Sequence, residues 1–122
     1  MAQENPTVGR FAPSPSGRMH LGNAFSALIA WLAVRSVGGE MVLRQEDLDP
    51  QRCKREYADQ IEADYRWLGL DWDRGGSAGG DAYYQSNRND IYAEAMETLR
   101  QNHLIYPCFC TRNQLHAASA PH

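Results

Sequence analysis

The sequence predicts an open α/β fold, in which strands of a doubly wound parallel sheet alternate with helices. A short apolar run at residues 8–12 and a strand pattern at residues 40–46, apolar at residues 41–43, alternate with segments of helical period at residues 23–36 and 52–68. Polar and charged residues follow each apolar run, as expected where the carboxyl ends of parallel strands carry a ligand site. The length of 122 residues suffices for one domain with its own core.

The first strand, over residues 8–12, is ended abruptly by two prolines and a glycine, and a helical period begins near Gly22. A strand, a tight loop and a helix start direct unpaired backbone N–H groups and the positive end of the helix dipole at one point, which suits phosphate or carboxylate. His20 and Gly22 stand at this point, where imidazole can donate a hydrogen bond and glycine lets a ligand approach the backbone. Taken alone, a histidine at a helix start is more often a cap or a surface residue.

The helix expected over residues 23–36 has apolar residues round much of its circumference, so we expect it to pack on more than one side. Gly38 and Gly39 end it. The next strand, over residues 40–46, is apolar at first and ends in charge, which places Glu46 and Asp47 at its carboxyl end. Taken alone, the charged segment that follows resembles a solvated acidic turn closed by proline.

A second helix is expected over residues 52–68, ended by Gly69. A short extended piece at residues 70–73 follows, and then a glycine-rich connection at residues 75–80. Because this connection lacks the Lys-Ser/Thr pair of a phosphate-binding loop, we interpret it as a flexible link.

A third helix is expected to open at Ser86 or Asn89 and to end near residue 102, followed by a strand at residues 104–106. Thr111 then caps a short helix, with Gln114 three residues on as a capping box. Between them, two cysteines in a Cys-x-Cys pattern place two thiolates on one tight turn, which is half of a tetrahedral zinc site. The spacing alone favours unligated cysteines.

Composition bounds the class of protein. Twelve lysines and arginines against fifteen acidic residues give a net charge of −3, which argues against a protein that coats nucleic acid but leaves room for a local basic face. The sequence has three cysteines, no signal peptide and no apolar run long enough to span a bilayer. We therefore expect a soluble protein in a reducing compartment, with the cytoplasm as the default. Residues 1–7 carry no pattern and are expected to form a loose leader.

Two stretches of the sequence resemble a known family. The stretch from Arg10 to Asn23 reads Arg-Phe-Ala-Pro-Ser-Pro-Ser-Gly-Arg-Met-His-Leu-Gly-Asn, and it resembles the first signature of the class I aminoacyl-tRNA synthetases in its glutamate-specific form. The stretch from Leu43 to Asp49 reads Leu-Arg-Gln-Glu-Asp-Leu-Asp and is similar to a second segment of that family. The resemblance implies that residues 8–106 are the first half of a Rossmann-like catalytic domain, the amino-terminal part of a longer enzyme.

The resemblance also implies roles for single residues. It assigns the substrate glutamate to Arg10, Ala12, Ser14 and Glu46, with Arg10 facing the side-chain carboxylate and Glu46 the α-ammonium group, as charge pairing at both ends of a dicarboxylic amino acid requires. It assigns ATP to a second set, which comprises His20 as the catalytic residue together with Gly22, Asn23 and Arg52. Asn23 departs from the family signature, which ends in histidine, but its neutral amide still donates to phosphate. A surface arginine that opens a helix is the other interpretation of Arg52.

The family comparison turns the Cys-x-Cys pattern toward a structural Zn²⁺ site held by Cys108 and Cys110. Residues 107–122 would then be the incomplete start of a zinc-binding insert, with His116 or His122 as a possible third ligand. The second class I signature needs lysines to hold pyrophosphate, and Lys54 is the sole lysine of this sequence. We therefore expect this chain by itself to bind parts of the substrates without catalysis.

The activity that the resemblance implies begins with L-glutamate and Mg²⁺-bound ATP, which form glutamyl-adenylate and pyrophosphate. Two acceptors compete. The segment after Glu46 and the final six residues favour a short branch of the family that esterifies queuosine in the anticodon of tRNA(Asp); the alternative charges tRNA(Glu) and activates glutamate only with that tRNA. A related nucleotidyltransferase with another acid substrate and a non-catalytic zinc-knuckle binding module stay open, and we expect a monomer.

Overall fold

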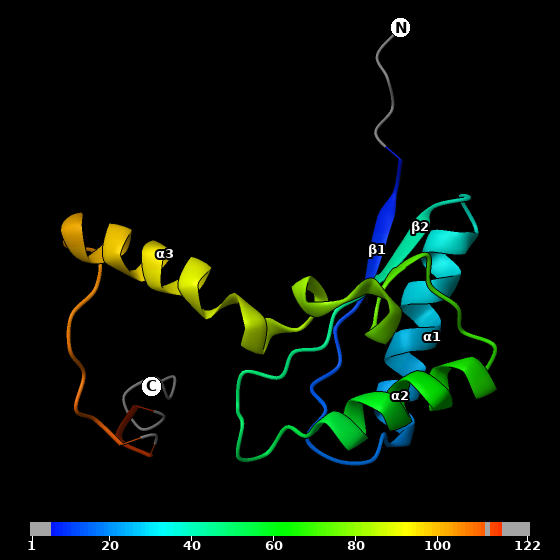
Figure 1. Cartoon of the computed structure of the whole chain (residues 1–122), viewed down its shortest axis with the longest axis horizontal. Coiled ribbons are helices and arrows are strands. Elements are labelled where there is room, and N and C mark those ends of the chain that lie inside the picture. Colours follow the sequence, from blue (N-terminus) through cyan, green and yellow to red (C-terminus); the bar gives the residue numbers. More distant parts are fainter. Residues whose placement is uncertain (1–5, 112, 116–122) are drawn as a thin grey trace, which may run out of the picture. The chain divides into compact units, whose positions relative to one another are not determined.

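The computed structural model describes residues 6–111 and 113–115. The chain divides into two compact units, residues 1–89 and 90–122. The described part of the first unit holds a three-stranded sheet, whose strands are β1 (Val8–Phe11), β2 (Glu40–Leu43) and β3 (Arg74–Gly75). It also holds two helices, α1 (Leu21–Arg35) and α2 (Arg55–Trp67), which Figure 1 labels together with β1 and β2. Three short 3₁₀ helices follow β3: η1 (Ser77–Gly79), η2 (Asp81–Tyr83) and η3 (Gln85–Arg88). Helix α3 (Asn89–Gln101) leads into the second unit.

The strands are parallel and follow the order β1-β2-β3, with Phe11 opposite Leu43 and Leu43 opposite Gly75. Pairing continues past the strand ends, because the Glu46 N–H donates to the Pro13 carbonyl at 2.8 Å and Gln45 forms a parallel bridge with Tyr84. The parallel α/β fold predicted from the sequence is confirmed, and the charged segment after β2 runs beside the loop after β1.

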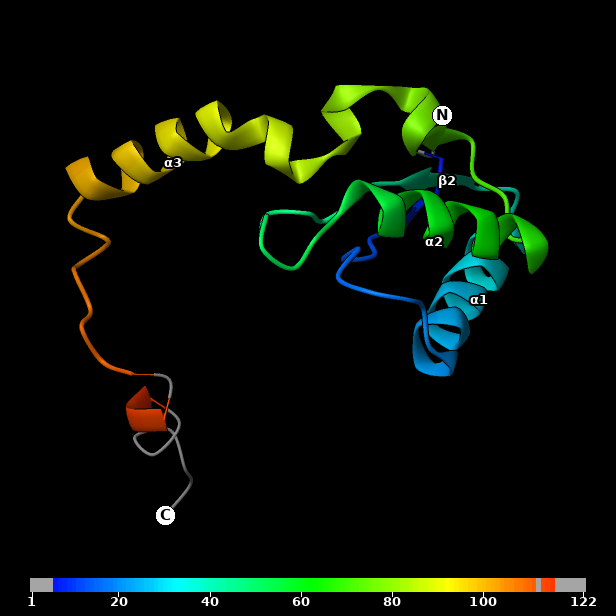
Figure 2. The ribbon, with the colours of Figure 1, turned by 60° about the horizontal axis from the view of Figure 1, so that its bottom comes forward.

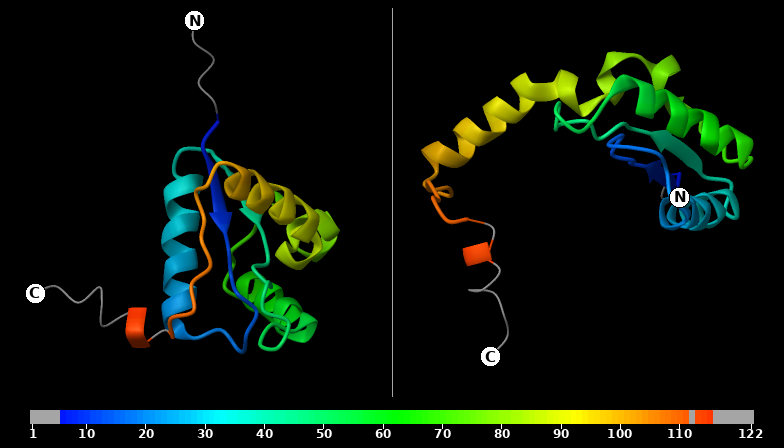
Figure 3. Two further views of the ribbon diagram at one scale, coloured as in Figure 1. Left: turned by 90° about the vertical axis from the view of Figure 1, so that its left-hand side faces the viewer. Right: turned by 90° about the horizontal axis from the view of Figure 1, so that it is seen from below.

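Helices α1 and α2 cover the same face of the sheet. Gly9 lies against Val34 of α1, where an added Cβ would come within 2.2 Å of Val34 Cγ2. Two positions along the strand, and so on the same face, the ring of Phe11 lies 4.8 Å from that of Tyr65 in α2. The core lies between this face and the two helices (Figure 3) and consists of Phe11, Ala27, Val34, Met41, Leu43, Ile61, Tyr65 and Leu70.

Helix α1 differs from the expectation that it packs on more than one side. Its buried residues, Ala27 and Val34, face the sheet. In the part of the chain that the structure describes, its large outward-facing apolar side chains are exposed by 41% to 86% of their surface: Leu21, Phe25, Leu28, Ile29 and Leu32. The expectation is therefore wrong for these residues, because the sheet contacts one side of the helix.

The glycine-rich connection is more ordered than the sequence predicts. Gly75 ends β3 with φ of +92°, and a Cβ there would lie 2.0 Å from the carbonyl oxygen of Leu43, so a side chain would break the strand pairing. The Gly76 N–H donates to the same carbonyl at 2.9 Å, and the buried carboxylate of Glu62 accepts from the Ser77 N–H at 2.7 Å. Pairing with β2 and α2, which has no local sequence signal, orders this segment.

Helix α3 confirms the third predicted helix, but the strand expected at residues 104–106 is absent and the described chain there is irregular (Figure 2). Leu104, Ile105 and Tyr106 are exposed by 69%, 37% and 83%. Apolar residues with strand propensity form no strand without a partner strand, which explains the difference. Thr111 and Gln114 do form the predicted capping box, since the Gln114 amide oxygen accepts from the Thr111 N–H at 2.8 Å.

None of the helices in the described ranges combines the length and the apolar composition that crossing a membrane requires.

Candidate functional site

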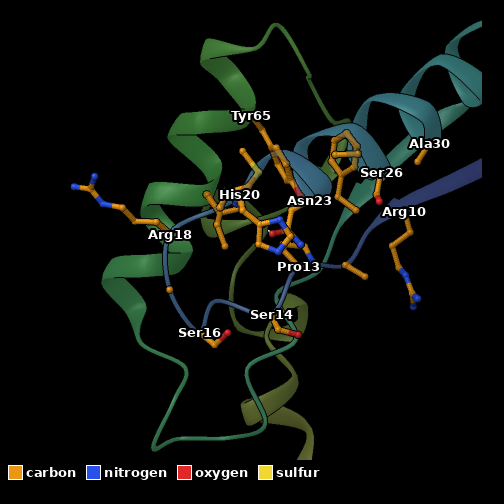
Figure 4. Close-up of a pocket in the computed structure, with 16 residues that line it drawn as sticks. Arg10, Pro13, Ser14, Ser16, Arg18, His20, Asn23, Ser26, Ala30 and Tyr65 are labelled. Carbon is orange, nitrogen blue, oxygen red and sulfur yellow. Dashed lines mark hydrogen bonds between the residues drawn. The ribbon is translucent and has the colours of Figure 1, made fainter.

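A hollow of about 480 Å³ lies beyond the carboxyl end of β1. Its walls come from the loop between β1 and α1, from the first turns of α1, and from Ile61 and Tyr65 of α2. Figure 4 shows His20 near the centre of this group with Asn23 beside it, while the guanidinium groups of Arg10 and Arg18 point outward on opposite sides. Of the residues predicted for substrate binding, the hollow brings together Arg10, Ala12, Ser14, His20 and Asn23.

The loop that forms the hollow is held by buried contacts and by a hydrogen bond from the segment before α2. Pro15 is fully buried, and its carbonyl accepts from the Lys54 N–H at 3.1 Å. The Ser16 N–H turns back to the carbonyl of Ser14 at 2.8 Å, and Met19 packs against the core. Together with the hydrogen bond from the Glu46 N–H to the Pro13 carbonyl, these contacts fix the chain on both sides of Ser14, so the serine hydroxyl is carried by an ordered backbone.

His20 is the N-cap residue of α1, with an extended backbone (φ −107°, ψ 169°). Its N–H donates to Oδ1 of Asn23 at 3.3 Å, and its carbonyl accepts from the Asn23 N–H at 3.0 Å. The imidazole lies over Gly22, where an added Cβ would come within 3.1 Å of Cε1. Asn23 therefore uses its amide oxygen within the helix cap, which leaves its NH₂ group able to donate outward.

The ionisable side chains of opposite sign are unequally represented around the hollow. Arg10, Arg18 and His20 line it, and its lining residues include no acidic side chain. The first turn of α1 also carries no acidic residue, whereas α2 and α3 carry Glu56 and Asp90 there. The positive end of the α1 dipole is thus left uncompensated, which suits a bound anion.

Tyr65 lines the inner wall of the hollow, where burial raises the pKa of its phenol to about 12. Its side chain therefore stays neutral at physiological pH. Together with Ile61 it forms an uncharged floor beneath the basic rim.

Arg10 and Glu46 lie close together at the carboxyl edge of the sheet. Nη2 of Arg10 is 3.9 Å from Oε1 of Glu46, and the same oxygen accepts a hydrogen bond from Nη2 of Arg44 at 2.8 Å. Glu46 does not line the hollow itself but stands beside it through Arg10. The structure therefore places the two oppositely charged groups predicted for the ends of one substrate next to each other.

Arg44 was not among the site residues predicted from the sequence. The signal for it was available, because Arg44 lies two residues before Glu46 and side chains at that spacing in an extended chain share a face. Arginine followed two positions later by glutamate, at the end of an apolar strand, thus predicts an ion pair at the strand terminus.

Arg52, Cys108 and Cys110 are not among the residues that line this hollow. Arg52 is exposed and does not line it; its backbone N–H donates to the Asp49 carbonyl at 3.2 Å. Cys108 and Cys110 belong to the second unit and are exposed, free thiols. Within the described residues no three metal-binding side chains cluster, and His116 and His122 lie outside them.

Comparison with known proteins identifies the family. Residues 7–120 match the tRNA synthetases of class I (E and Q) over their catalytic domain. With a parallel α/β sheet and a basic hollow at the start of its first helix, the chain belongs to this family of ligases, whose members described below are specific for glutamate.

Named relatives narrow the comparison. The chain is 52% identical over 117 residues to the glutamyl-Q tRNA(Asp) synthetase of Nitratidesulfovibrio vulgaris, a match that covers 93% of this chain and 36% of that protein. It is 49% identical over 108 residues to glutamate–tRNA ligase 2 of Alkalilimnicola ehrlichii, covering 87% of this chain and 23% of that protein. The chain thus spans about a third of the length of the first relative and less of the second.

A solved structure with the same fold is the glutamate tRNA ligase of Elizabethkingia meningosepticum, crystallised in complex with its amino acid. The TM-score is 0.74 at 32% sequence identity, and the match covers 93% of this chain and 23% of that one. The resemblance inferred from two sequence motifs is therefore confirmed at the level of family and fold.

Proposed function

We propose that this chain supplies the glutamate-binding and ATP-binding first half of an enzyme that converts L-glutamate and Mg²⁺-bound ATP to glutamyl-adenylate. The observation that carries the proposal is the opposed pair of Arg10 and Glu46 beside a basic hollow that contains His20. A guanidinium fits a carboxylate and a carboxylate fits an ammonium, so the pair selects a dicarboxylic amino acid.

In this proposal Arg10 binds the side-chain carboxylate of glutamate, Glu46 binds its α-ammonium group, and Ala12 and Ser14 line the path between them. His20, Gly22 and Asn23 receive the phosphates at the start of α1, where N–H groups and the helix dipole favour negative charge. Mg²⁺ travels with ATP and offsets its phosphate charge. Arg52 is proposed as an outer contact for ATP, with its position at the turn before α2 as support.

The chemical step is an in-line displacement. An oxygen of the α-carboxylate forms a bond to the α-phosphorus while the bond from that phosphorus to pyrophosphate breaks. Hydrogen-bond donors already aimed at the phosphates stabilise the charge that develops, and positioning of both substrates removes much of the entropic barrier. His20 donates to the phosphate oxygen, which makes it the catalytic residue of this half of the site.

We propose queuosine of tRNA(Asp) as the acceptor, supported by the 52% identity to a glutamyl-Q tRNA(Asp) synthetase. The 49% identity to a glutamate–tRNA ligase favours the second candidate, which charges tRNA(Glu). The two share the activation step and differ in the acceptor. The protein is expected to act in the cytoplasm as a monomer.

Glutamate-dependent ATP–pyrophosphate exchange by the full-length protein, with and without tRNA, tests both steps. Exchange without tRNA supports the queuosine-modifying enzyme. Exchange that requires tRNA(Glu) supports the tRNA(Glu)-charging enzyme. No exchange under any of these conditions would contradict glutamate activation.

The glutamate site is tested by Arg10→Ala, which we expect to abolish glutamate use far more than ATP binding. Equal losses for both substrates would contradict the role of Arg10. His20→Ala is the matched variant, since it removes a donor to phosphate and leaves the Arg10–Glu46 pair in place. We expect this variant to lose more in the rate of ATP–pyrophosphate exchange than in glutamate binding.

We also propose that Cys108 and Cys110 supply two thiolates to a structural Zn²⁺, with further ligands from outside the described residues. Two exposed cysteines separated by a single residue fit half of a tetrahedral site. The test is metal analysis of the purified protein beside Cys108→Ser and Cys53→Ser variants. Loss of zinc in the first and not in the second is expected; equal zinc content in all three contradicts the assignment.

A further inference from the structure

Arg44 directs its guanidinium at the carboxylate that the proposed function assigns to the substrate ammonium group. Nη2 of Arg44 donates to Oε1 of Glu46 at 2.8 Å, and the two side chains are only 29% and 28% exposed. The backbone N–H of Arg44 donates to the carbonyl of Phe11 at 3.0 Å. A half-buried guanidinium on a paired backbone holds its partner in one place at a small cost in side-chain entropy.

Arg10 competes for the same carboxylate. Its Nη2 lies 3.9 Å from Oε1 of Glu46, and its side chain is 53% exposed, so about half of its surface is free of packing. Opposite charges at this distance attract. If Arg10 and Glu46 closed into a tight ion pair, the two groups assigned to the ends of the substrate would neutralise each other.

We propose that Arg44 is a positioning residue that keeps Glu46 and Arg10 apart. By holding Oε1 of Glu46 it leaves Oε2, which has no hydrogen-bond partner among the described residues, for the substrate ammonium group. Arg10 is then free for the side-chain carboxylate. Arg44 itself touches no substrate in this arrangement, and the inference rests on the proposed function for the roles of the other two residues.

The test uses glutarate, the five-carbon dicarboxylate without an amino group. Glutarate needs Arg10 and has no ammonium for Glu46, so its binding reports whether Arg10 is free. We expect Arg44→Gln to weaken glutarate binding roughly twofold to fivefold, in line with the strength of a partly exposed ion pair between Arg10 and Glu46. The binding is followed by NMR titration of the full-length protein, which needs no catalysis.

The double variant Arg44→Gln/Glu46→Gln separates positioning from direct contact. Without a carboxylate at residue 46 nothing captures Arg10, so the double variant is expected to bind glutarate at least as well as the unsubstituted protein. This non-additivity is the signature of a residue that acts through another. Arg44→Lys, which keeps the charge, is expected to restore most of the binding lost in Arg44→Gln.

Arg74→Gln is the matched control. Arg74 pairs with Glu40 at the opposite end of β2, so its loss removes an arginine–glutamate pair of the same sheet without touching the site. It is expected to leave glutarate binding unchanged.

Unchanged binding in Arg44→Gln overturns the inference. A double variant that stays weak overturns it too, since Arg44 would then contact the ligand or support the fold. The expected glutarate pattern together with no glutamate-dependent exchange would leave Arg44 in its role and count against the proposed function alone.

Discussion

Asp47 accepts two hydrogen bonds from Ser86, a residue 39 positions further along the chain. Its Oδ1 receives the Ser86 N–H at 3.0 Å and its Oδ2 receives the Ser86 hydroxyl at 2.6 Å. Two backbone hydrogen bonds of Gln45 join the same two segments. The Gln45 N–H donates to the Tyr83 carbonyl at 2.9 Å, and the Gln45 carbonyl accepts from the Gln85 N–H at 3.0 Å. The chain that carries Glu46 is therefore tied to the segment before α3.

The first prediction concerns this tie. Asp47→Ala removes both acceptors and is expected to cost about 1 kcal/mol locally, because hydrogen bonds to a charged acceptor are lost at a partly exposed site. Hydrogen exchange of the Ser86 amide should then become several-fold faster. Ser86→Ala removes one donor and should change the hydrogen-exchange rates of the segment around Asp47 by a smaller factor. Equal exchange rates in all three proteins would contradict the role of Asp47.

The second prediction concerns the closest approach of α1 to the sheet. Gly9→Ala forces a methyl group to within 2.2 Å of Val34 Cγ2 and 2.8 Å of Met41 Sδ, and we expect a loss of about 1–3 kcal/mol in the free energy of unfolding. Urea unfolding measures it. Gly17→Ala is the control, since nothing lies within 4 Å of its added Cβ. Adding Val34→Ala to Gly9→Ala should recover part of the loss; no recovery would mean that the clash is not the cause.

The third prediction concerns the buried carboxylate of Glu62, which is 1% exposed. It accepts from the Ser77 N–H at 2.7 Å and from the Ser77 hydroxyl at 2.8 Å. Glu62→Leu leaves this N–H without an acceptor, at an expected cost of about 1–3 kcal/mol in unfolding free energy. Glu62→Gln keeps one acceptor and should lose less, so equal losses in urea unfolding would exclude the hydrogen bond as the cause.

The fourth prediction concerns acid stability. Hydrogen bonds from Trp31 and Arg35 to Asp71 lower the pKa of Asp71, and hydrogen bonds from Arg35 and the Met41 N–H lower the pKa of Asp73, both from the ordinary value of 3.8. A carboxylate whose pKa is lowered in the folded state stabilises that state at every pH above the ordinary pKa. This stabilisation is lost as the pH falls through the lowered pKa.

The thermal midpoint should therefore fall below about pH 4, the ordinary carboxyl range. Asp73→Asn should flatten this part of the curve, because the amide cannot titrate while its oxygen still accepts from the Met41 N–H. Parallel curves for the two proteins between pH 5 and pH 2 would show that Asp73 carries none of the acid dependence.

Much of the fold follows from local patterns. The apolar run that became β1 and the helical periods of α1, α2 and α3 each have a signal within a few residues, because side-chain spacing and end signals are properties of neighbouring positions. The same holds for the motif from Arg10 to Asn23, whose length and whose prolines and glycines indicated the family. The short β3 and the order in the glycine-rich connection had no such signal, since they depend on the carbonyl of Leu43 and the carboxylate of Glu62.

By itself the sequence determined the class of fold, the family and the residue types at the site. Tertiary structure decided that the ends of β1 and β2 meet, so that Arg10 approaches the carboxylate of Glu46, which Arg44 contacts from two residues away in the same segment. The physical reason is that parallel pairing of β1 with β2 fixes a register between residues more than 30 positions apart. Pairwise distances between charges depend on that register, and no local pattern contains it.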